Sequence, residues 1–303
     1  SRKVSLVNVT TIQLLLGIVT TEHLELEQMS VTTTFLHEDL NEDIYMSQPK
    51  GFTAMGEDGH PVCRLKKSLY GLRQASWMWY ENFDSHIGQL GYRRSDFDPC
   101  MYMWNISGES RIYLILYVDD MLTVGCDKAE FEDLKRRLHE KISMKELRQA
   151  RHIMGMRIEW DRSEKILQLS QTEYIRKVLK GFNMDTSKPA LTPFPTLIQQ
   201  LIRESPSTEV EKEQMRTIPY TSTVGSLMYT MVATRPYLAY VLDDTSQYMS
   251  NPRKKHWEVF KRIFHYLQEQ RICSWHSHQD IRPRLKAIPT LTTHEIQKIG
   301  NRH

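Results

Sequence analysis

The sequence predicts an α+β fold, because short apolar runs of strand character occur together with longer segments whose apolar residues repeat at helical spacing. Two apolar runs, 112–116 and 121–124, flank a tight joint and predict a hairpin. A second hairpin is predicted from 153–160 and 166–169, on either side of the polar segment 161–165. Strands and helices are therefore expected to share one chain.

The elements before the first hairpin are predicted by periodicity and by helix-end signals. Apolar residues at helical spacing predict a helix over 10–20, and an alternating pattern predicts a strand over 24–31. A further helix is expected to begin near Ser76 and to end at Gly91, because glycine readily takes the left-handed conformation that ends a helix. A strand over 100–104 then precedes the hairpin.

Helices dominate after the first hairpin. Asp127 and Glu130 resemble a capping box and predict the start of a helix with one apolar face. The other face of this helix carries Lys135, Arg136 and Arg137, and we expect it to be solvated. The same periodicity predicts later helices over 171–182, 224–234 and 256–268.

Composition is that of an ordinary globular protein. The chain has 303 residues, 40% of them hydrophobic and 25% charged, which is enough for one large domain or two. The net charge of +3 permits a nucleic-acid partner without indicating one. The four cysteines form no CxxC pair, so we expect reduced, buried thiols. No apolar run is long enough to span a bilayer.

Two adjacent carboxylates, Asp119 and Asp120, lie at the joint of the first hairpin. The central residues of a two-residue hairpin turn need φ > 0, for which Asn-Gly or Asp-Gly is better suited than Asp-Asp. Adjacent like charges between apolar strands are also costly unless a positive charge compensates them. Mg²⁺ is a natural candidate, because it prefers a few carboxylates together with substrate phosphates. The alternative is a solvated acidic turn that only ends two strands.

Several longer stretches occur in a fixed order over roughly residues 10–270. They are TTTFLHEDLNEDIYMSQPKGF, VCRLKKSLYGLRQA, LYVDDMLTVG, GMRI, LSQTEYIRKVL, PYTSTVGSLMYTMVATRPYLAYVL and YMSNPRKKHWEVFKRIFHYL. In this order they resemble the reverse transcriptase domain of copia-type long-terminal-repeat retrotransposons, and the ordered set disfavours the solvated turn. The resemblance implies a right-hand polymerase fold: a palm with an antiparallel sheet and helices on one face, partial fingers, and a thumb-like helical C-terminal part.

The same resemblance implies the activity of an RNA-directed DNA polymerase, which adds a nucleotide to a primer 3′ end. Mg²⁺ (or Mn²⁺) held by carboxylates would activate the 3′ hydroxyl and stabilise the charge that develops at the α-phosphate. Asp119 and Asp120 match two of the three catalytic and metal-binding aspartates of the family. Because neighbouring strand positions point to opposite faces, we expect Asp119 to make most of the metal contact and Asp120 to be secondary.

The partners implied by the resemblance are an RNA or DNA primer-template and a dNTP, without a membrane. The oligomeric state is left open. The implied location is intracellular, either in a cytoplasmic particle or in the nucleus.

Ser30 stands where the family has its first catalytic aspartate. A neutral hydroxyl is a poor Mg²⁺ ligand beside a carboxylate, so we expect an impaired metal site. The family's Ala-Pro-Arg and Arg-Pro-Asp read Ala75-Ser76-Trp77 and Arg235-Pro236-Tyr237 here. We also expect the preceding fingers segment and the following acidic RNase H motif to be missing. We therefore expect a degenerate, truncated copy; the alternatives are a non-catalytic nucleic-acid-binding remnant and a pseudogene product.

Further site residues follow from the resemblance. Gly71, Arg73 and Gln74 match the stretch that packs against the incoming nucleotide and template, although a plain helix-entry turn is an equal alternative. Lys66 and Lys67 are expected either to contact phosphate or to form a solvated strand face.

For two other sets of residues, nucleic-acid binding and core packing are both possible roles. Met154, Gly155 and Met156 resemble the primer-gripping element, although core packing suits the methionines better. Trp77 and Trp79 could stack on bases, although helical aromatic residues more often belong to a core.

The expected organisation has five parts. The chain begins with Ser1-Arg2-Lys3, which is no signal peptide and lacks an initiator methionine, so we expect a fragment of a longer polyprotein or an internal excision. The parts are 1–148, partial fingers and palm with the first hairpin; 149–185, second hairpin and thumb-like helix; 186–219, a linker rich in Pro, Ser and Thr; 220–270, a helical connection segment; and 271–303, a divergent tail without an RNase H motif.

Overall fold

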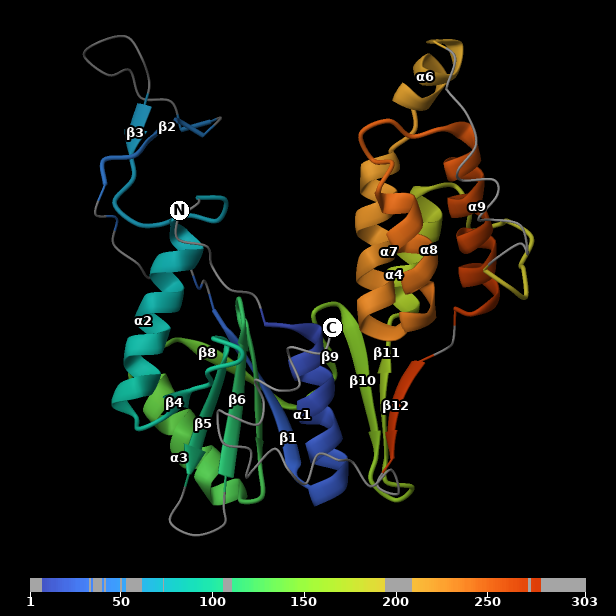
Figure 1. The fold of residues 1–303 in the computed structure, drawn as a ribbon. Coiled ribbons are helices and arrows are strands. Elements are labelled where there is room, and N and C mark those ends of the chain that lie inside the picture. The colour runs from blue at the N-terminus through green and yellow to red at the C-terminus, as the bar shows by residue number, and fades with distance from the viewer. Residues whose placement is uncertain are drawn as a thin grey trace. The chain divides into compact units, whose positions relative to one another are not determined.

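Strands from distant parts of the chain assemble into two main sheets, each in its own unit (Figure 1). One unit contains residues 1–11 and 23–150, and the other contains residues 12–22 and 151–303. The computed structural model describes residues 7–32, 34, 40, 42–49, 51–52, 62–72, 74–105, 111–193, 209–271 and 274–278. Each unit is described by itself.

The first unit is built on a six-stranded sheet in which all neighbouring strands are antiparallel. In spatial order the strands are β4 (Arg93–Arg94), β5 (Met101–Asn105), β6 (Arg111–Tyr117), β7 (Asp120–Gly125), β1 (Glu25–Val31) and β8 (Met144–Gln149). The predicted first hairpin is confirmed as β6 and β7. It lies in the middle of the sheet, where β7 pairs with β1.

Helices α2 (Ala75–Gln89) and α3 (Lys128–His139) pack on one face of this sheet. Their apolar side chains share a core with Met29, Leu114 and Met121 of the central strands. Gly91 has φ +92°, which confirms the predicted end of the helix at that glycine. A small sheet of β2 (Tyr45–Ser47) and β3 (Val62–Arg64) precedes α2.

Helix α3 begins as predicted and differs from the prediction on its polar face. The Asp127 side chain accepts a hydrogen bond from the Ala129 backbone N–H at 2.7 Å, so it caps the helix. Arg136 is exposed, as expected. The expectation of a solvated face is wrong for Lys135, which is only 6% exposed. Its ammonium is compensated by carboxylates from two neighbouring strands and from α3 itself, as described below.

The second unit contains a four-stranded antiparallel sheet. Its strands are, in spatial order, β12 (Ser274–His278), β11 (Ile166–Ser170), β10 (Met156–Asp161) and β9 (His152–Ile153). The second predicted hairpin is thereby confirmed. Strand β12 lies in the segment expected to be a divergent tail, and its polar residues pair with β11.

Helices form most of the rest of the second unit. They are α1 (Val9–Glu22, whose last eleven residues belong here), α4 (Thr172–Gly181), α6 (Glu209–Arg216), α7 (Tyr220–Thr234), the 3-10 helix η2 (Pro236–Leu238), α8 (Ala239–Ser246) and α9 (Lys254–Glu269). Helix α6 lies inside the expected linker 186–219, so the C-terminal part of that segment is helical. Helix α8 was not predicted. Within the described residues, no helix is both long and apolar enough to span a membrane.

Arg235 joins helix ends in this unit. Its side chain is fully buried and donates to the Thr234 backbone carbonyl at 3.2 Å and to the Gln270 carbonyl at 2.8 Å. These carbonyls lie at the C-terminal ends of α7 and α9, where the helix dipole favours a cation. Arg235 thus satisfies two helix ends that packing has removed from water.

Three described cysteines, Cys63, Cys100 and Cys126, form no disulfide bond. The expected burial holds for Cys100 and is wrong for Cys126, which is exposed. Burial raises the pKa of the Cys100 thiol to about 12, so this thiol is unreactive at neutral pH.

Candidate active site

The hairpin turn between β6 and β7 consists of Val118 and Asp119. Tyr117 pairs directly with Asp120, so Asp120 is already the first residue of β7. The positive φ that a tight turn demands is taken by Val118, at +52°. A single positive φ at the first central position is typical of a type II′ turn, where glycine is usual. A β-branched residue there carries strain of roughly 1–3 kcal/mol.

Two hydrogen bonds from outside the hairpin hold this turn. The indole Nε1–H of Trp79 donates to the Val118 carbonyl at 3.0 Å. The backbone N–H of Val31, on β1, donates to the Asp119 carbonyl at 2.7 Å. Trp79 is buried in the α2 core, which confirms the packing interpretation for this residue, and Trp77 is half-buried. The bond from Trp79 to the turn had no signal in the sequence.

Ser30 lies directly opposite Asp120 in the register of β1 and β7. The flanking residues Met29 and Met121 belong to the core beneath α2 and α3. Because successive strand side chains point to opposite faces, Ser30 and Asp120 project together from the other face of the sheet.

The Asp120 carboxylate accepts hydrogen bonds from the side chains of Ser30 and Gln28. Burial raises its pKa above the ordinary value; the two hydrogen bonds act in the opposite direction, and the charge of Asp119 adds to the rise. Gln28 was missed in the sequence, although it lies two residues before Ser30 on a strand and therefore shares its face.

Asp119 has one carboxylate oxygen with a protein partner and one without. Its Oδ2 accepts a hydrogen bond from the Tyr70 hydroxyl at 3.4 Å. Its Oδ1 is buried, and within the described part of the chain no group donates to it. A buried, unsatisfied carboxylate oxygen is costly, which favours an additional positive partner.

The atoms that could bind a metal ion here are the side-chain oxygens of Asp119, Asp120 and Ser30. Oxygen ligands suit a hard cation such as Mg²⁺. The buried free oxygen of Asp119 also fits such an ion. Nevertheless, among the described residues no set of three His, Cys, Asp or Glu side chains is arranged to hold a metal. The two aspartates, called the aspartate pair below, are therefore a two-carboxylate site.

The stretch before α2 is partly described. Gly71 has φ +96°, and a Cβ built there would meet no atom within 4 Å, so the turn requires glycine for its backbone conformation and not for lack of space. The Gln74 amide donates to the Glu42 carboxylate at 3.3 Å. Lys66 and Lys67 are exposed. Arg73 lies outside the described residues.

The stretch that resembles the primer-gripping element forms the turn between β9 and β10, in the second unit. Met154 and Gly155 both have positive φ, +52° and +75°, as a tight hairpin turn requires. The Met154 carbonyl accepts a hydrogen bond from the Tyr229 hydroxyl at 2.5 Å. Met156 is fully buried, so packing explains this residue.

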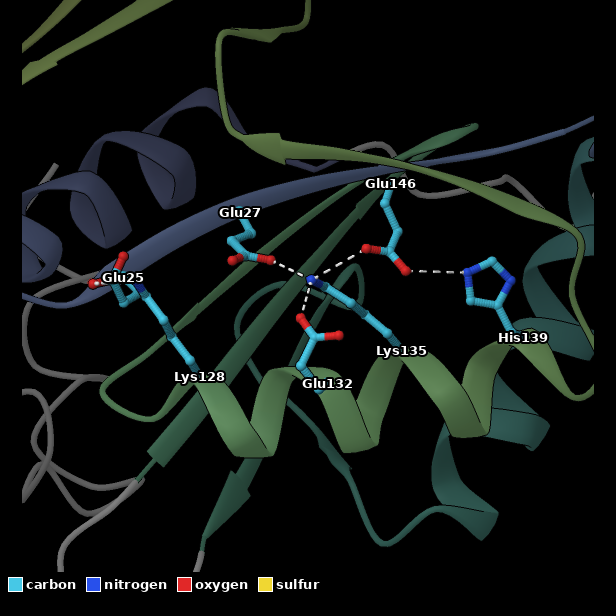
Figure 2. A network of polar contacts seen from close by, with 7 residues as sticks. All are labelled: Glu25, Glu27, Lys128, Glu132, Lys135, His139 and Glu146. Atoms are coloured by element: carbon cyan, nitrogen blue, oxygen red, sulfur yellow. Dashed lines mark hydrogen bonds and ion pairs between the residues drawn. The ribbon is translucent and has the colours of Figure 1, made fainter.

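A second acidic group on the same sheet has its own cation (Figure 2). The Lys135 ammonium lies 2.7 Å from a carboxylate oxygen of Glu27, 2.7 Å from one of Glu132 and 3.5 Å from one of Glu146. Burial alone would lower the pKa of Lys135, but the hydrogen bonds and charges of these carboxylates raise it. These four residues are called the lysine cluster below.

Comparison with known proteins identifies the family. Residues 3–196 match the family model described as reverse transcriptase (RNA-dependent DNA polymerase). The chain is 45% identical to a retrovirus-related Pol polyprotein from transposon TNT 1-94 of Nicotiana tabacum over 262 residues, 86% of this chain and 20% of that protein. It is 34% identical to the corresponding polyprotein from transposon RE2 of Arabidopsis thaliana, over 85% of this chain and 17% of that protein.

A shorter relative is the putative transposon Ty5-1 protein of Saccharomyces cerevisiae. It is 30% identical over 244 residues, 80% of this chain and 76% of that protein. The chain spans at most 20% of the length of either plant polyprotein. In all three comparisons the aligned region covers 80% or more of this chain. The chain belongs to the reverse transcriptase family, as the reverse transcriptase domain of a copia-type retrotransposon polyprotein.

Proposed function

We propose that the aspartate pair is the metal-binding centre of an RNA-directed DNA polymerase, and that Ser30 impairs this centre. The observation that carries the proposal is the buried Oδ1 of Asp119, which lacks a partner among the described residues. It lies in the turn of a hairpin at the middle of an antiparallel sheet, next to a second carboxylate with a raised pKa. An arrangement this unfavourable is explained by a cation that arrives with substrate.

Asp119 and Asp120 have different roles in this proposal. Asp119 would hold the ion through its free oxygen, whereas Asp120 is engaged by Ser30 and Gln28 and would contribute less. Mg²⁺ or Mn²⁺ bound there would supply activation of the primer 3′ hydroxyl and stabilisation of charge at the α-phosphate. The contribution of the chain itself is to orient the Asp119 carboxylate on a fixed turn and the Asp120 carboxylate at the start of β7.

Ser30 weakens this site in two ways. It supplies no charge where the family has a carboxylate, and a neutral hydroxyl is a weak Mg²⁺ ligand. Its hydroxyl also donates to Asp120 and so occupies part of that carboxylate. The non-catalytic nucleic-acid-binding remnant is the second candidate function, and Ser30 is the observation that favours it.

The parts of a right-hand polymerase are assigned by the same proposal. The six-stranded sheet with α2 and α3 would be the palm, and β2 with β3 would be a remnant of the fingers. The helices of the second unit would be the thumb-like part and the connection. An RNA or DNA primer-template and a dNTP are the proposed partners, inside the cell, with Lys66, Lys67 and Gln74 near the nucleotide.

Primer extension tests the proposal. A DNA primer on an RNA template is incubated with dNTPs and Mg²⁺ or Mn²⁺, using the unmodified chain, Ser30→Asp, and Ser30→Asp combined with Asp119→Asn. We expect Ser30→Asp to gain extension and Asp119→Asn to abolish it. Extension by the unmodified chain at the rate of Ser30→Asp would contradict the impairment.

Binding of the same primer-template, measured at several salt concentrations, separates the two candidate functions. If all three proteins bind in a salt-dependent way and none extends, the nucleic-acid-binding remnant is the correct function. If none binds, both candidates are wrong.

A further inference from the structure

The turn that carries Asp119 is strained and held from one side by a single side chain. Val118 has φ +52°, a conformation that a β-branched residue adopts only when the surroundings impose it. Its carbonyl accepts the Trp79 indole N–H at 3.0 Å. Val118 also packs against the core that contains Trp79.

Trp79 is itself immobilised. Trp79 is 3% exposed, and its ring centroid lies 5.7 Å from that of Phe83, one helical turn further along α2. An indole N–H can donate one hydrogen bond, and here the turn receives it. The donor therefore comes from a rigid helix, and its direction is set by core packing.

The neighbouring peptide is fixed from the other direction. The Asp119 carbonyl accepts the Val31 N–H at 2.7 Å, so β1 and α2 together anchor consecutive carbonyls of the turn. Rotation of either peptide plane would move the Asp119 carboxylate. The Val31 bond is one of many between strands, whereas the Trp79 bond comes from a side chain and can be removed by substitution.

We propose that Trp79 is a positioning residue: by donating its indole N–H to the Val118 carbonyl, it fixes the strained turn that presents the Asp119 carboxylate to a divalent cation. This inference rests on the proposed function, because it assumes that the aspartate pair takes a metal ion. Trp79 does not touch the metal or the substrate. Groups that hydrogen-bond to a metal ligand and orient it typically contribute tenfold or more to metal affinity, and Trp79 would act in the same sense through the backbone of the turn.

The test compares two replacements of Trp79 with a matched control. Trp79→Phe removes the donor and part of the ring. Replacement of Trp79 by 3-benzothienylalanine keeps the fused-ring shape and exchanges the N–H for sulfur, so it remains informative if Trp79→Phe fails to fold. The control is Trp104→Phe; Trp104 packs against the same core and stacks on Tyr92 with 5.8 Å between ring centroids.

The first readout is Mn²⁺ affinity, measured by electron paramagnetic resonance in the unmodified and Ser30→Asp backgrounds. We expect both Trp79 replacements to weaken Mn²⁺ binding roughly tenfold and Trp104→Phe to leave it unchanged at a similar loss of thermal stability. Equal affinities in the Trp79 and Trp104 variants would overturn the inference, because Trp79 would then act by packing alone.

The second readout needs no metal. Backbone chemical shifts of Val118 report its left-handed φ, and we expect them to move toward ordinary extended values in both Trp79 variants and to stay constant in Trp104→Phe. Unchanged Val118 shifts would overturn the inference. Changed shifts without Mn²⁺ binding in either background would support the positioning role of Trp79 and contradict the metal site of the proposed function.

Discussion

The lysine cluster and the aspartate pair are two acidic groups on one sheet, and among the residues that the structure describes only the lysine cluster contains a cation. In the lysine cluster, one buried ammonium is shared by Glu27, Glu132 and Glu146. In the aspartate pair, the described residues supply hydrogen-bond donors but no ion pair, and one oxygen of Asp119 has no partner. Strand β1 passes through both groups, with Glu27 in the first and Ser30 in the second.

The difference teaches how a structural acidic group is distinguished from a candidate metal site. A buried charge is tolerated when a fixed opposite charge is close, and the chain provides Lys135 for that purpose. The aspartate pair lacks such a partner in the described part of the chain, and the proposed function assigns that role to a divalent cation. The predictions below test this contrast.

The largest effect is expected from removal of the internal cation. Lys135→Met keeps the apolar stem and leaves Glu27 and its neighbours without their counter-charge. We expect a loss of about 3 kcal/mol in the free energy of unfolding, because an unpaired buried charge is costly. Urea unfolding followed by circular dichroism measures this.

The control for this prediction lies on the same helix. Lys128 is 72% exposed and pairs with Glu25 at 3.8 Å, so Lys128→Met should cost less than about 1 kcal/mol. If both substitutions lower the free energy of unfolding by the same amount, the buried ion pairs of Lys135 are no more important than the exposed pair of Lys128, and the contrast between the lysine cluster and the aspartate pair fails.

A medium effect is expected from adding the missing carboxylate. Ser30→Asp places a third negative charge opposite Asp120, so without metal the variant should lose about 1 kcal/mol of stability. Mn²⁺ at a hundred times its dissociation constant should then restore about 2.7 kcal/mol. Thermal unfolding in EDTA and in Mn²⁺ measures both changes.

Ser30→Asn is the matched control, because it has the size of aspartate without the charge. It should show no reversal between EDTA and Mn²⁺. An Asp variant that is as stable as the Asn variant in EDTA would show that the aspartate pair is not crowded by charge.

The smallest effect is expected from Asp120→Asn. The folded-state pKa of Asp120 is raised above the unfolded value of about 3.9. Between these two pKa values the folded protein binds more protons than the unfolded chain, so its stability falls as the pH rises through this interval. Asparagine removes this penalty. We expect a slightly higher Tm than that of the unmodified chain at pH 7, and no difference below about pH 3, where the carboxyl is protonated in both the folded and the unfolded state. A lower Tm than that of the unmodified chain at pH 7 would contradict the raised folded-state pKa of Asp120.

Periodicity and end signals predicted much of the fold. Both hairpins and the α2 and α3 helices follow from apolar spacing and from Asp127 and Gly91, which act locally. Strand β8 was missed because five of its six residues are exposed and four of these are polar, and it is held by pairing with β1. Strand β12 was missed for a similar reason, since its pairing with β11 is a contact between distant residues.

The candidate site was predicted in part. The sequence singles out Asp119, Asp120 and Ser30, and the register of β1 and β7 places Ser30 opposite Asp120. The burial of Lys135 could not be predicted from helical spacing, because its counter-charges come partly from strands elsewhere in the chain. The bond from Trp79 likewise depends on how α2 packs on the sheet.

Mn²⁺ binding to the Ser30→Asp protein is the most direct test that the aspartate pair takes an external cation and that the lysine cluster does not. Calorimetric titration would compare this protein with versions that also carry Asp119→Asn or Glu27→Gln. We predict one site that Asp119→Asn abolishes and Glu27→Gln preserves. Loss of the site in the Glu27→Gln protein together with its retention in the Asp119→Asn protein would contradict the account.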